Sequence, residues 1–164
     1  MKEIIIASGN KGKIKETQEI LKDFKIISMN DLGVEIDVEE DQDSFEGNAR
    51  KKAEEISREL NGKMCIADDS GIEIEYLNGF PGVFTKRWHK GTDRQRNLAI
   101  IEKLKGVPKE ERKIRFVTAI ALSDSRKTIC SFFSFNLLTS FLSSLSVLNI
   151  IKLPLTFIFG IFLL

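Results

Sequence analysis

The sequence contains few of the residues that build disulfide frameworks or zinc centres. Its 164 residues include two cysteines and one histidine. Cys65 and Cys130 lie in apolar runs with no cysteine or histidine beside them. Neither therefore has the spacing of a metal ligand, and two cysteines alone do not make a disulfide scaffold. We expect both to be buried, reduced thiols, as free cysteines usually are.

The chain also shows no secretory leader and no strong charge of either sign. Met1-Lys2-Glu3 leads into four apolar residues, much less than the apolar core of a signal peptide. Together with the reduced thiols, this predicts a cytoplasmic protein. The formal net charge of +1 provides no global field for a polyanion, which argues against nucleic acid as a partner. A local cluster of charges can still hold a triphosphate.

Charged residues are almost missing from the last part of the chain. Residues 131–164 contain one charged side chain, Lys152, so all 24 acids and 24 of the 25 bases lie in residues 1–130. Seven of the twelve phenylalanines fall in the same tail. This break in composition predicts a folded domain over residues 1–130 and an aberrant hydrophobic tail over 131–164.

Strand and helix patterns alternate through residues 1–130. Helices are expected after a polar loop at Ser8–Lys13, from Asp43 with Ala49, Ala53, Ile56 and Leu60 facing inward, and from Thr92 with Leu98, Ile101 and Leu104 facing inward. Strands are expected at Glu3–Ala7, Lys25–Met29, Val34–Val38, Lys63–Ala67, Gly71–Tyr76, Ile114–Leu122 and Lys127–Phe133. The order predicts an α/β fold, with a mixed twisted sheet flanked by helices and a core that is incomplete at the C-terminus.

The first candidate site is the glycine-punctuated loop Ser8–Lys13. Its glycines let the backbone come close to a ligand, while Lys13 and the N–H groups of a helix start suit phosphate oxygens. The loop is not a Walker A motif, because two residues separate its glycines and Ile14 follows the lysine. An ordinary strand-to-helix turn is the alternative.

The second candidate is the acidic run Glu39-Glu40-Asp41, which leads into Ser44–Ala53. Mg²⁺ takes oxygen ligands from one or two carboxylates together with substrate phosphates. Lys52, further along the predicted helix, is placed to reach the same phosphates. The alternative is a solvated helix surface of mixed charge.

The third candidate is Asp68-Asp69-Ser70-Gly71, expected at the carboxyl end of a buried strand. Adjacent carboxylates there are costly unless a metal or hydrogen-bond donors accompany them. Open α/β sheets bind ligands outside the carboxyl ends of their strands. The alternative is a polar turn in which Asp68 caps backbone N–H groups.

In order and spacing these blocks resemble the inosine triphosphate pyrophosphatase family. The resemblance runs from residue 2 to about residue 130 and is carried by Ser8–Lys13, Ser44–Ala53, Ala67–Gly71, Gly79–Phe84 and Arg87-Trp88. The related Maf-like group is a weaker match, because of the Asp68–Gly71 and Asn78–Gly82 blocks. The resemblance implies Mg²⁺-dependent hydrolysis of non-standard purine nucleoside triphosphates (dITP, ITP and XTP) to the monophosphate and pyrophosphate, by a homodimer.

The resemblance also implies a role for each matching residue. Glu40 and Asp69 would be Mg²⁺ ligands, and Asp69 would be the catalytic proton acceptor. Because a carboxylate bound to Mg²⁺ is a poor base, that role includes orienting water. The substrate contacts would be Ser8, Gly9, Asn10, Lys11, Gly12, Lys13, Lys52 and Ser70.

Beyond residue 130 the chain departs from the family. The family continues with a segment ending Phe-Gly-Tyr-Asp, then a lysine, then Ser-His-Arg, which hold the base. None of these follows residue 130 here, and the single histidine, His89, lies in a loop that we expect to be exposed. We therefore expect poor solubility and little or no turnover, and a nucleotide-binding remnant without catalysis is an alternative.

Three interpretations of the tail stay open. The first, which we prefer, is a reading-frame change near residue 130, tested by translating the other two frames of the gene. The second is a membrane anchor over residues 128–151, which carry no charge. The six serines of Ser131–Ser146 argue against the anchor. The third is a native variant.

Overall fold

The computed structural model describes residues 1–137. Predictions for the remainder of the tail, including most of the stretch proposed as an anchor, lie outside the described residues. The described chain is organised as two compact units. The first contains Met1–Asp69 and Ala119–Phe133, and the second contains Ser70–Thr118.

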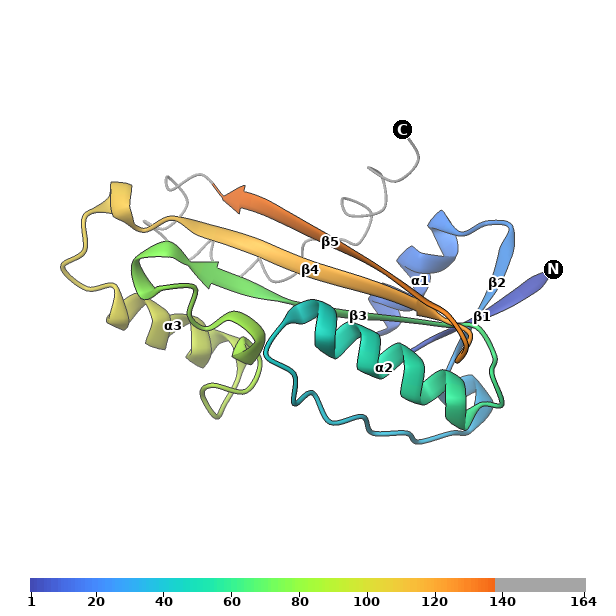
Figure 1. The fold of residues 1–164 in the computed structure, drawn as a ribbon. Coiled ribbons are helices and arrows are strands. Elements are labelled where there is room, and N and C mark those ends of the chain that lie inside the picture. The colour runs from blue at the N-terminus through green and yellow to red at the C-terminus, as the bar shows by residue number, and fades with distance from the viewer. Residues whose placement is uncertain (138–164) are drawn as a thin grey trace. The chain divides into compact units, whose positions relative to one another are not determined.

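The elements confirm the predicted α/β class with a mixed sheet flanked by helices (Figure 1). In the described residues the strand order is β2-β1-β3-β4-β5. The strands are β1 (Lys2–Ile6), β2 (Phe24–Ser28), β3 (Cys65–Ile74), β4 (Ile114–Ser123) and β5 (Thr128–Leu137). The helices are α1 (Lys11–Ile20), α2 (Phe45–Glu59) and α3 (Asp93–Lys103), with 3-10 turns η1 (Asn30–Leu32), η2 (Glu75–Leu77), η3 (Gly82–Phe84) and η4 (Lys109–Glu111).

The core of the first unit is built around β1, which pairs in parallel with β2 and with β3. Its isoleucines Ile4, Ile5 and Ile6 are almost fully buried, as expected of a parallel strand covered on both faces. After β4 the chain turns into β5, which begins near the strand predicted at Lys127–Phe133. The Asp124 carboxylate accepts the N–H groups of Arg126 at 3.0 Å and Lys127 at 2.9 Å, which closes the turn into β5.

Helix α2 packs one face into the first unit, as its alanine spacing predicts. Ala49 and Ala53 have no exposed surface. The helix begins one residue later than predicted, because the Ser44 hydroxyl, and not the Asp43 carboxylate, accepts the N–H of Gly47 at 3.1 Å. Leu60 follows the end of the helix and is only half-buried.

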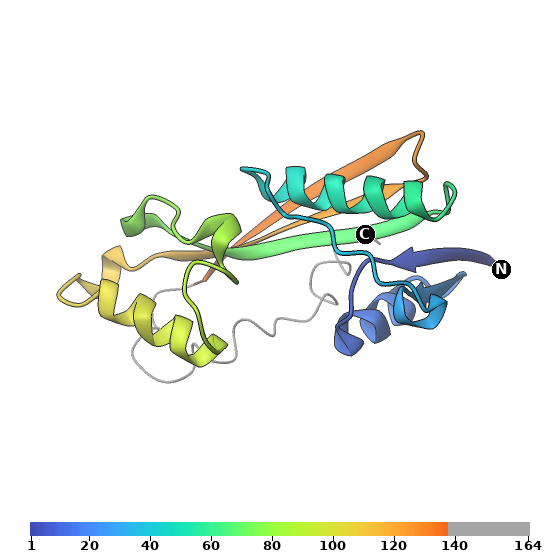
Figure 2. The same ribbon diagram turned by 90° about the horizontal axis from the view of Figure 1, so that it is seen from below.

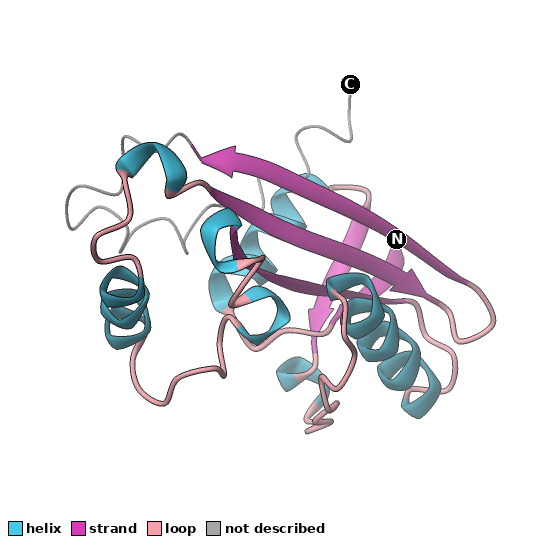
Figure 3. Ribbon diagram, turned by 60° about the vertical axis from the view of Figure 1, so that its left-hand side comes forward, coloured by secondary structure: helices cyan, strands magenta, loops and turns pink. Residues whose placement is uncertain are grey.

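The segment Val34–Asp43 is irregular, so the predicted strand at Val34–Val38 is wrong (Figure 3). We call residues 34–43 the strap. The strap runs along α2 in the direction opposite to the helix (Figures 1 and 2). Its residues alternate between half-buried and exposed from Val34 to Glu40. The alternating burial therefore comes from an extended segment with one partly covered face. Residues 34–43 form no strand.

In the second unit, the predicted start of α3 at Thr92 is confirmed by a capping box. Thr92 accepts from the N–H of Gln95, whose side chain accepts from the N–H of Thr92. The predicted inner face is wrong at two positions, because Leu98 and Ile101 are 46% and 39% exposed. The helix is rotated so that buried Asn97, Ile100 and Leu104 line its inner face, at the i, i+3, i+7 spacing of one helical stripe.

The remaining predictions concern the cysteines, the histidine and the membrane. Cys65 is fully buried as predicted, whereas Cys130 on edge strand β5 is only half-buried. His89 is exposed, as predicted. None of the helices within residues 1–137 has the length and apolar character that a membrane crossing requires. The part of the proposed anchor that is described, Thr128–Leu137, is strand β5.

Candidate functional site

The loop after β1 is closed by a helix cap. Asn10 is the N-cap of α1, and its Oδ1 accepts the N–H of Gly12 at 2.8 Å and that of Lys13 at 3.4 Å. The Ser8 hydroxyl in turn accepts the N–H of Asn10 at 3.2 Å. Residues Lys11 to Lys13 are thus the first turn of the helix, and the predicted loop is shorter than expected.

Parallel pairing between β1 and β3 ends at the same place. The last paired residues are Ile6 and Ile66, and the Ala7 N–H then reaches the Ile66 carbonyl at 2.9 Å. The chain leaves the sheet there and enters α1, while β3 continues. Asp68–Gly71 is therefore inside a strand, and the prediction that the strand ends at Ala67 is wrong. The two carboxylates nonetheless lie just beyond the carboxyl end of β1.

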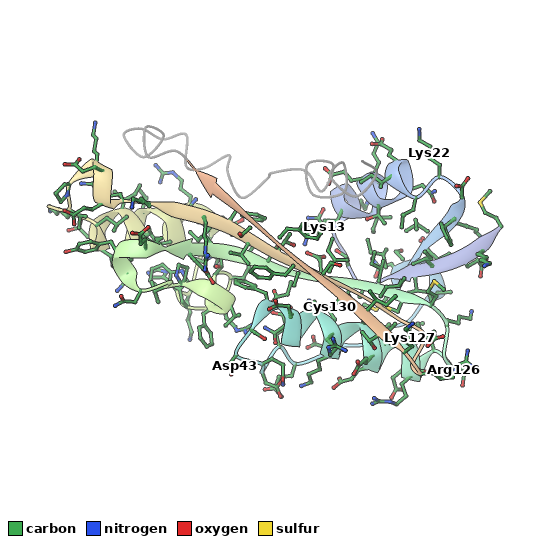
Figure 4. All side chains as sticks on the ribbon, turned by 45° about the horizontal axis from the view of Figure 1, so that its top comes forward. Lys13, Lys22, Asp43, Arg126, Lys127 and Cys130 are labelled. Atoms are coloured by element: carbon green, nitrogen blue, oxygen red, sulfur yellow. The ribbon has the colours of Figure 1, made fainter. Side chains whose placement is uncertain are left out.

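Asp68 and Asp69 point to opposite faces of β3, because successive side chains alternate along a strand. Asp68 forms an ion pair with the ammonium group of Lys13 on α1 (Figure 4 labels Lys13). Asp69 is 8% exposed, and its Oδ2 accepts Nδ2 of Asn48 on α2 at 2.9 Å. Each carboxylate thus has a donor from a different helix, which offsets the cost of burying it.

The strap brings Glu40 to the same end of the unit. Lys52 Nζ lies 2.6 Å from Glu40 Oε1 and 3.0 Å from the carbonyl oxygen of Asp68. One lysine therefore ties the strap to β3. Lys51 pairs with Asp41 at 2.8 Å, and its hydrogen bond holds the pKa of the Asp41 carboxyl below the ordinary value.

The structure therefore brings five side chains of the first unit to the place where the pairing of β1 with β3 ends. They are Lys13, Glu40, Lys52, Asp68 and Asp69. Lys13 and Lys52 both contact Asp68, Lys52 also contacts Glu40, and Asp69 contacts Asn48. Ser70 follows in β3 and is half-buried. Sequence reasoning missed Asn48, which is 1% exposed. A polar residue beside Ala49 on a predicted inner face was the available signal, because buried polar groups require partners.

The donor set fits a hard divalent cation that is completed by substrate. No group of three His, Cys, Asp or Glu side chains within residues 1–137 is placed to hold a metal ion. Mg²⁺ does not need one, because it is commonly held by one or two carboxylates, substrate phosphates and water. In such a site Glu40 and Asp69 would be the carboxylates, and Lys13 and Lys52 would place positive charge near phosphates.

Comparison with known proteins identifies the family. The Ham1 family profile matches residues 4–135. The chain belongs to the Ham1 family. Among curated relatives, a protein of Clostridium perfringens named dITP/XTP pyrophosphatase is 45% identical over 139 residues, covering 79% of this chain and 68% of the relative. A Bacillus subtilis protein of the same name is 43% identical over 127 residues, covering 75% of this chain and 64% of the relative.

Solved Ham1 structures share the fold. The Staphylococcus aureus Ham1 protein superposes with a TM-score of 0.75 at 36% identity, covering 82% of this chain and 70% of the other. A Coxiella burnetii HAM1 protein gives a TM-score of 0.75 at 33% identity, covering 83% and 72%. The Ham1 chain thus spans about two thirds of the length of its curated relatives. The family resemblance predicted from the sequence is confirmed.

Proposed function

We propose that this Ham1 chain is a nucleoside-triphosphate pyrophosphohydrolase that converts dITP, ITP and XTP to the monophosphate and pyrophosphate. One observation carries the proposal: two lysines and three carboxylates gather where the pairing of β1 with β3 ends. Lys13 pairs with Asp68, Lys52 bonds to Glu40 and to the Asp68 carbonyl, and Asp69 bonds to Asn48. Curated relatives named dITP/XTP pyrophosphatase support the substrate class.

Each group has a role that follows from its charge and position. Ser8–Lys13, Lys52 and Ser70 would bind the triphosphate, with the two ammonium groups opposing its negative charge. Glu40 and Asp69 would hold Mg²⁺, which offsets phosphate charge and polarises the phosphoryl oxygen when bound. Asp69 would orient the attacking water and accept its proton while the bond between the α- and β-phosphates breaks.

Three further assignments belong to the proposal. We propose Mg²⁺ as the metal, a homodimer as the assembly and the cytoplasm as the location. The free thiols of Cys65 and Cys130 support a reducing compartment. Light scattering at several protein concentrations tests the dimer.

The proposed activity is tested by pyrophosphate release from dITP. We expect turnover to be weak, to require Mg²⁺ and to be lost on chelation, and we expect Asp69→Asn to lower kcat by a further factor of about 100 or more. Equal turnover by Asp69→Asn and the unmodified chain would refute the catalytic assignment. Calorimetric binding of dITP is measured in parallel. Binding without turnover identifies the nucleotide-binding remnant and agrees with the prediction that turnover is weak in this chain.

A further inference from the structure

Asn48 uses both ends of its amide, one on a carboxylate of the proposed metal site and one on the strap. Its Nδ2 donates to Asp69 Oδ2 at 2.9 Å, and its Oδ1 accepts the N–H of Gln42 at 3.0 Å. The side chain is 1% exposed. Only one orientation of the amide satisfies both partners, because the carboxylate needs a donor and the N–H needs an acceptor. The planar amide of Asn48 therefore links β3 to the strap.

The backbone of the strap approaches α2 closely at the same point. A Cβ added to Gly47 would lie 2.8 Å from Cβ of Gln42 and 3.0 Å from Oγ of Ser44. Because Gln42 Cβ is fixed to the strap backbone, a side chain at position 47 would push the strap away from the helix. Gly47 thus permits the distance at which Asn48 can reach Gln42.

The contacts continue along α2 in a regular order. After Asn48 contacts Gln42, Lys51 pairs with Asp41, and Lys52 pairs with Glu40. Because the strap runs antiparallel to α2, later residues of the helix contact earlier residues of the strap. A displacement of Gln42 is therefore transmitted to Glu40. The position of Glu40 relative to Asp69 is therefore determined at Asn48.

We propose that Asn48 is a positioning residue that holds Glu40 and Asp69 as a matched pair of ligands for a divalent cation, with Gly47 permitting the close contact. The proposal rests on the proposed function, because it takes these two carboxylates as the cation ligands. It adds a residue that contacts neither cation nor substrate and acts through the carboxylate and the strap.

Two substitutions test the proposal on the full chain. Asn48→Leu keeps the approximate shape and removes both hydrogen bonds. Gly47→Ala removes no polar group and favours the helix, but displaces the strap. Asn97→Leu is the matched control, because Asn97 is also a buried helical asparagine, 4% exposed, in the second unit.

The readout is Mn²⁺ affinity by electron paramagnetic resonance, with Mn²⁺ in place of Mg²⁺ because both prefer carboxylate oxygen ligands. We expect Asn48→Leu and Gly47→Ala each to weaken Mn²⁺ binding about 10- to 100-fold, as loss of a group that orients a ligand does. Asn97→Leu should bind as the unmodified chain does. Circular dichroism melting reports folding of every variant, and Gly47→Ala decides the outcome if Asn48→Leu unfolds.

Glu40→Gln and Asp69→Asn separate the two ways in which the proposal can fail. If both weaken Mn²⁺ binding while folded Asn48→Leu and Gly47→Ala do not, the role of Asn48 is refuted and the metal site stands. If neither weakens binding, the metal site itself is refuted and the role of Asn48 falls with it. In a turnover assay, a positioning role raises the Mg²⁺ concentration for half-maximal rate, while kcat recovers at saturating Mg²⁺.

Discussion

Cys65 begins β3 with no exposed surface, and this burial raises the pKa of its thiol from 9.0 to about 12. The neutral thiol is therefore favoured in the folded state. Since the folded pKa lies above the unfolded one, this stabilisation is complete below pH 9 and is lost as the pH rises toward 12.

We expect Cys65→Ala to remove this alkaline sensitivity. At pH 10 the unfolded thiol ionises and the folded thiol does not, which costs the unmodified chain ~1 kcal/mol relative to the variant. Urea unfolding at pH 7.5 and pH 10 under reducing conditions measures the difference. If the two proteins differ in free energy of unfolding by the same amount at both pH values, the raised pKa of Cys65 is contradicted.

Lys52 and Lys51 are adjacent and both pair with the strap, but only Lys52 also contacts β3. We expect Lys52→Met to raise KM for dITP about tenfold or more, because it removes a charge-assisted contact to phosphate. Lys51→Met should change KM little, since surface ion pairs contribute little. Steady-state kinetics at saturating Mg²⁺ compare the two. Equal effects would mean that Lys52 acts only through the strap.

At the scale of elements, the start of α2 provides a test of capping. Ser44→Ala should lower the free energy of unfolding by about 1 kcal/mol, the usual cost of losing an N-cap. Asp43→Ala is the neighbouring control, and its effect should be a fraction of that (Figure 4 labels Asp43). Urea denaturation of both variants measures this. If Asp43→Ala lowers the free energy of unfolding more than Ser44→Ala does, the N-cap is Asp43, the residue predicted from the sequence.

The elements also show what a single sequence determines. Helix α2 and the parallel strands could be predicted because buried alanines and isoleucines recur at helical and strand periods. Helix α3 was located correctly, but its inner face was misassigned, because buried Asn97 occupies a position that hydrophobicity assigns to the surface. The strap alternates in burial as a strand does, yet it runs along α2 as irregular chain.

The candidate site, too, could be predicted only in part from the sequence. Lys13, Glu40, Lys52 and Asp69 could be named from residue type and family resemblance. Their partners could not, because hydrogen bonds between residues 21 or 55 positions apart depend on how elements pack. Asn48 is the clearest case: its residue type predicts a turn or a cap, and only the packing of α2 against β3 and the strap gives it its partners, Asp69 and the N–H of Gln42.

At the scale of the whole molecule, the affinity of this chain should come mainly from the triphosphate. The segments with which the family holds the base do not occur in the 164 residues, whereas the phosphate-binding groups of the first unit do. We expect dITP and dGTP to bind with affinities within about tenfold, a difference of ~1.4 kcal/mol. Isothermal titration calorimetry with Mg²⁺ measures both. A preference for dITP of two orders of magnitude would show that other residues select the base.

The antiparallel contact between the strap and α2 has a consequence for the order of folding. Gln42 and Asn48 are six residues apart, and Glu40 and Lys52 are twelve apart, whereas Lys13 and Asp68 are separated by 55. Short-range contacts close with little loss of chain entropy and form early, and distant ones form late. We therefore expect a refolding chain to place Glu40 against α2 before Lys13 reaches Asp68, so that one of the two proposed cation ligands is in position before β3 brings the other.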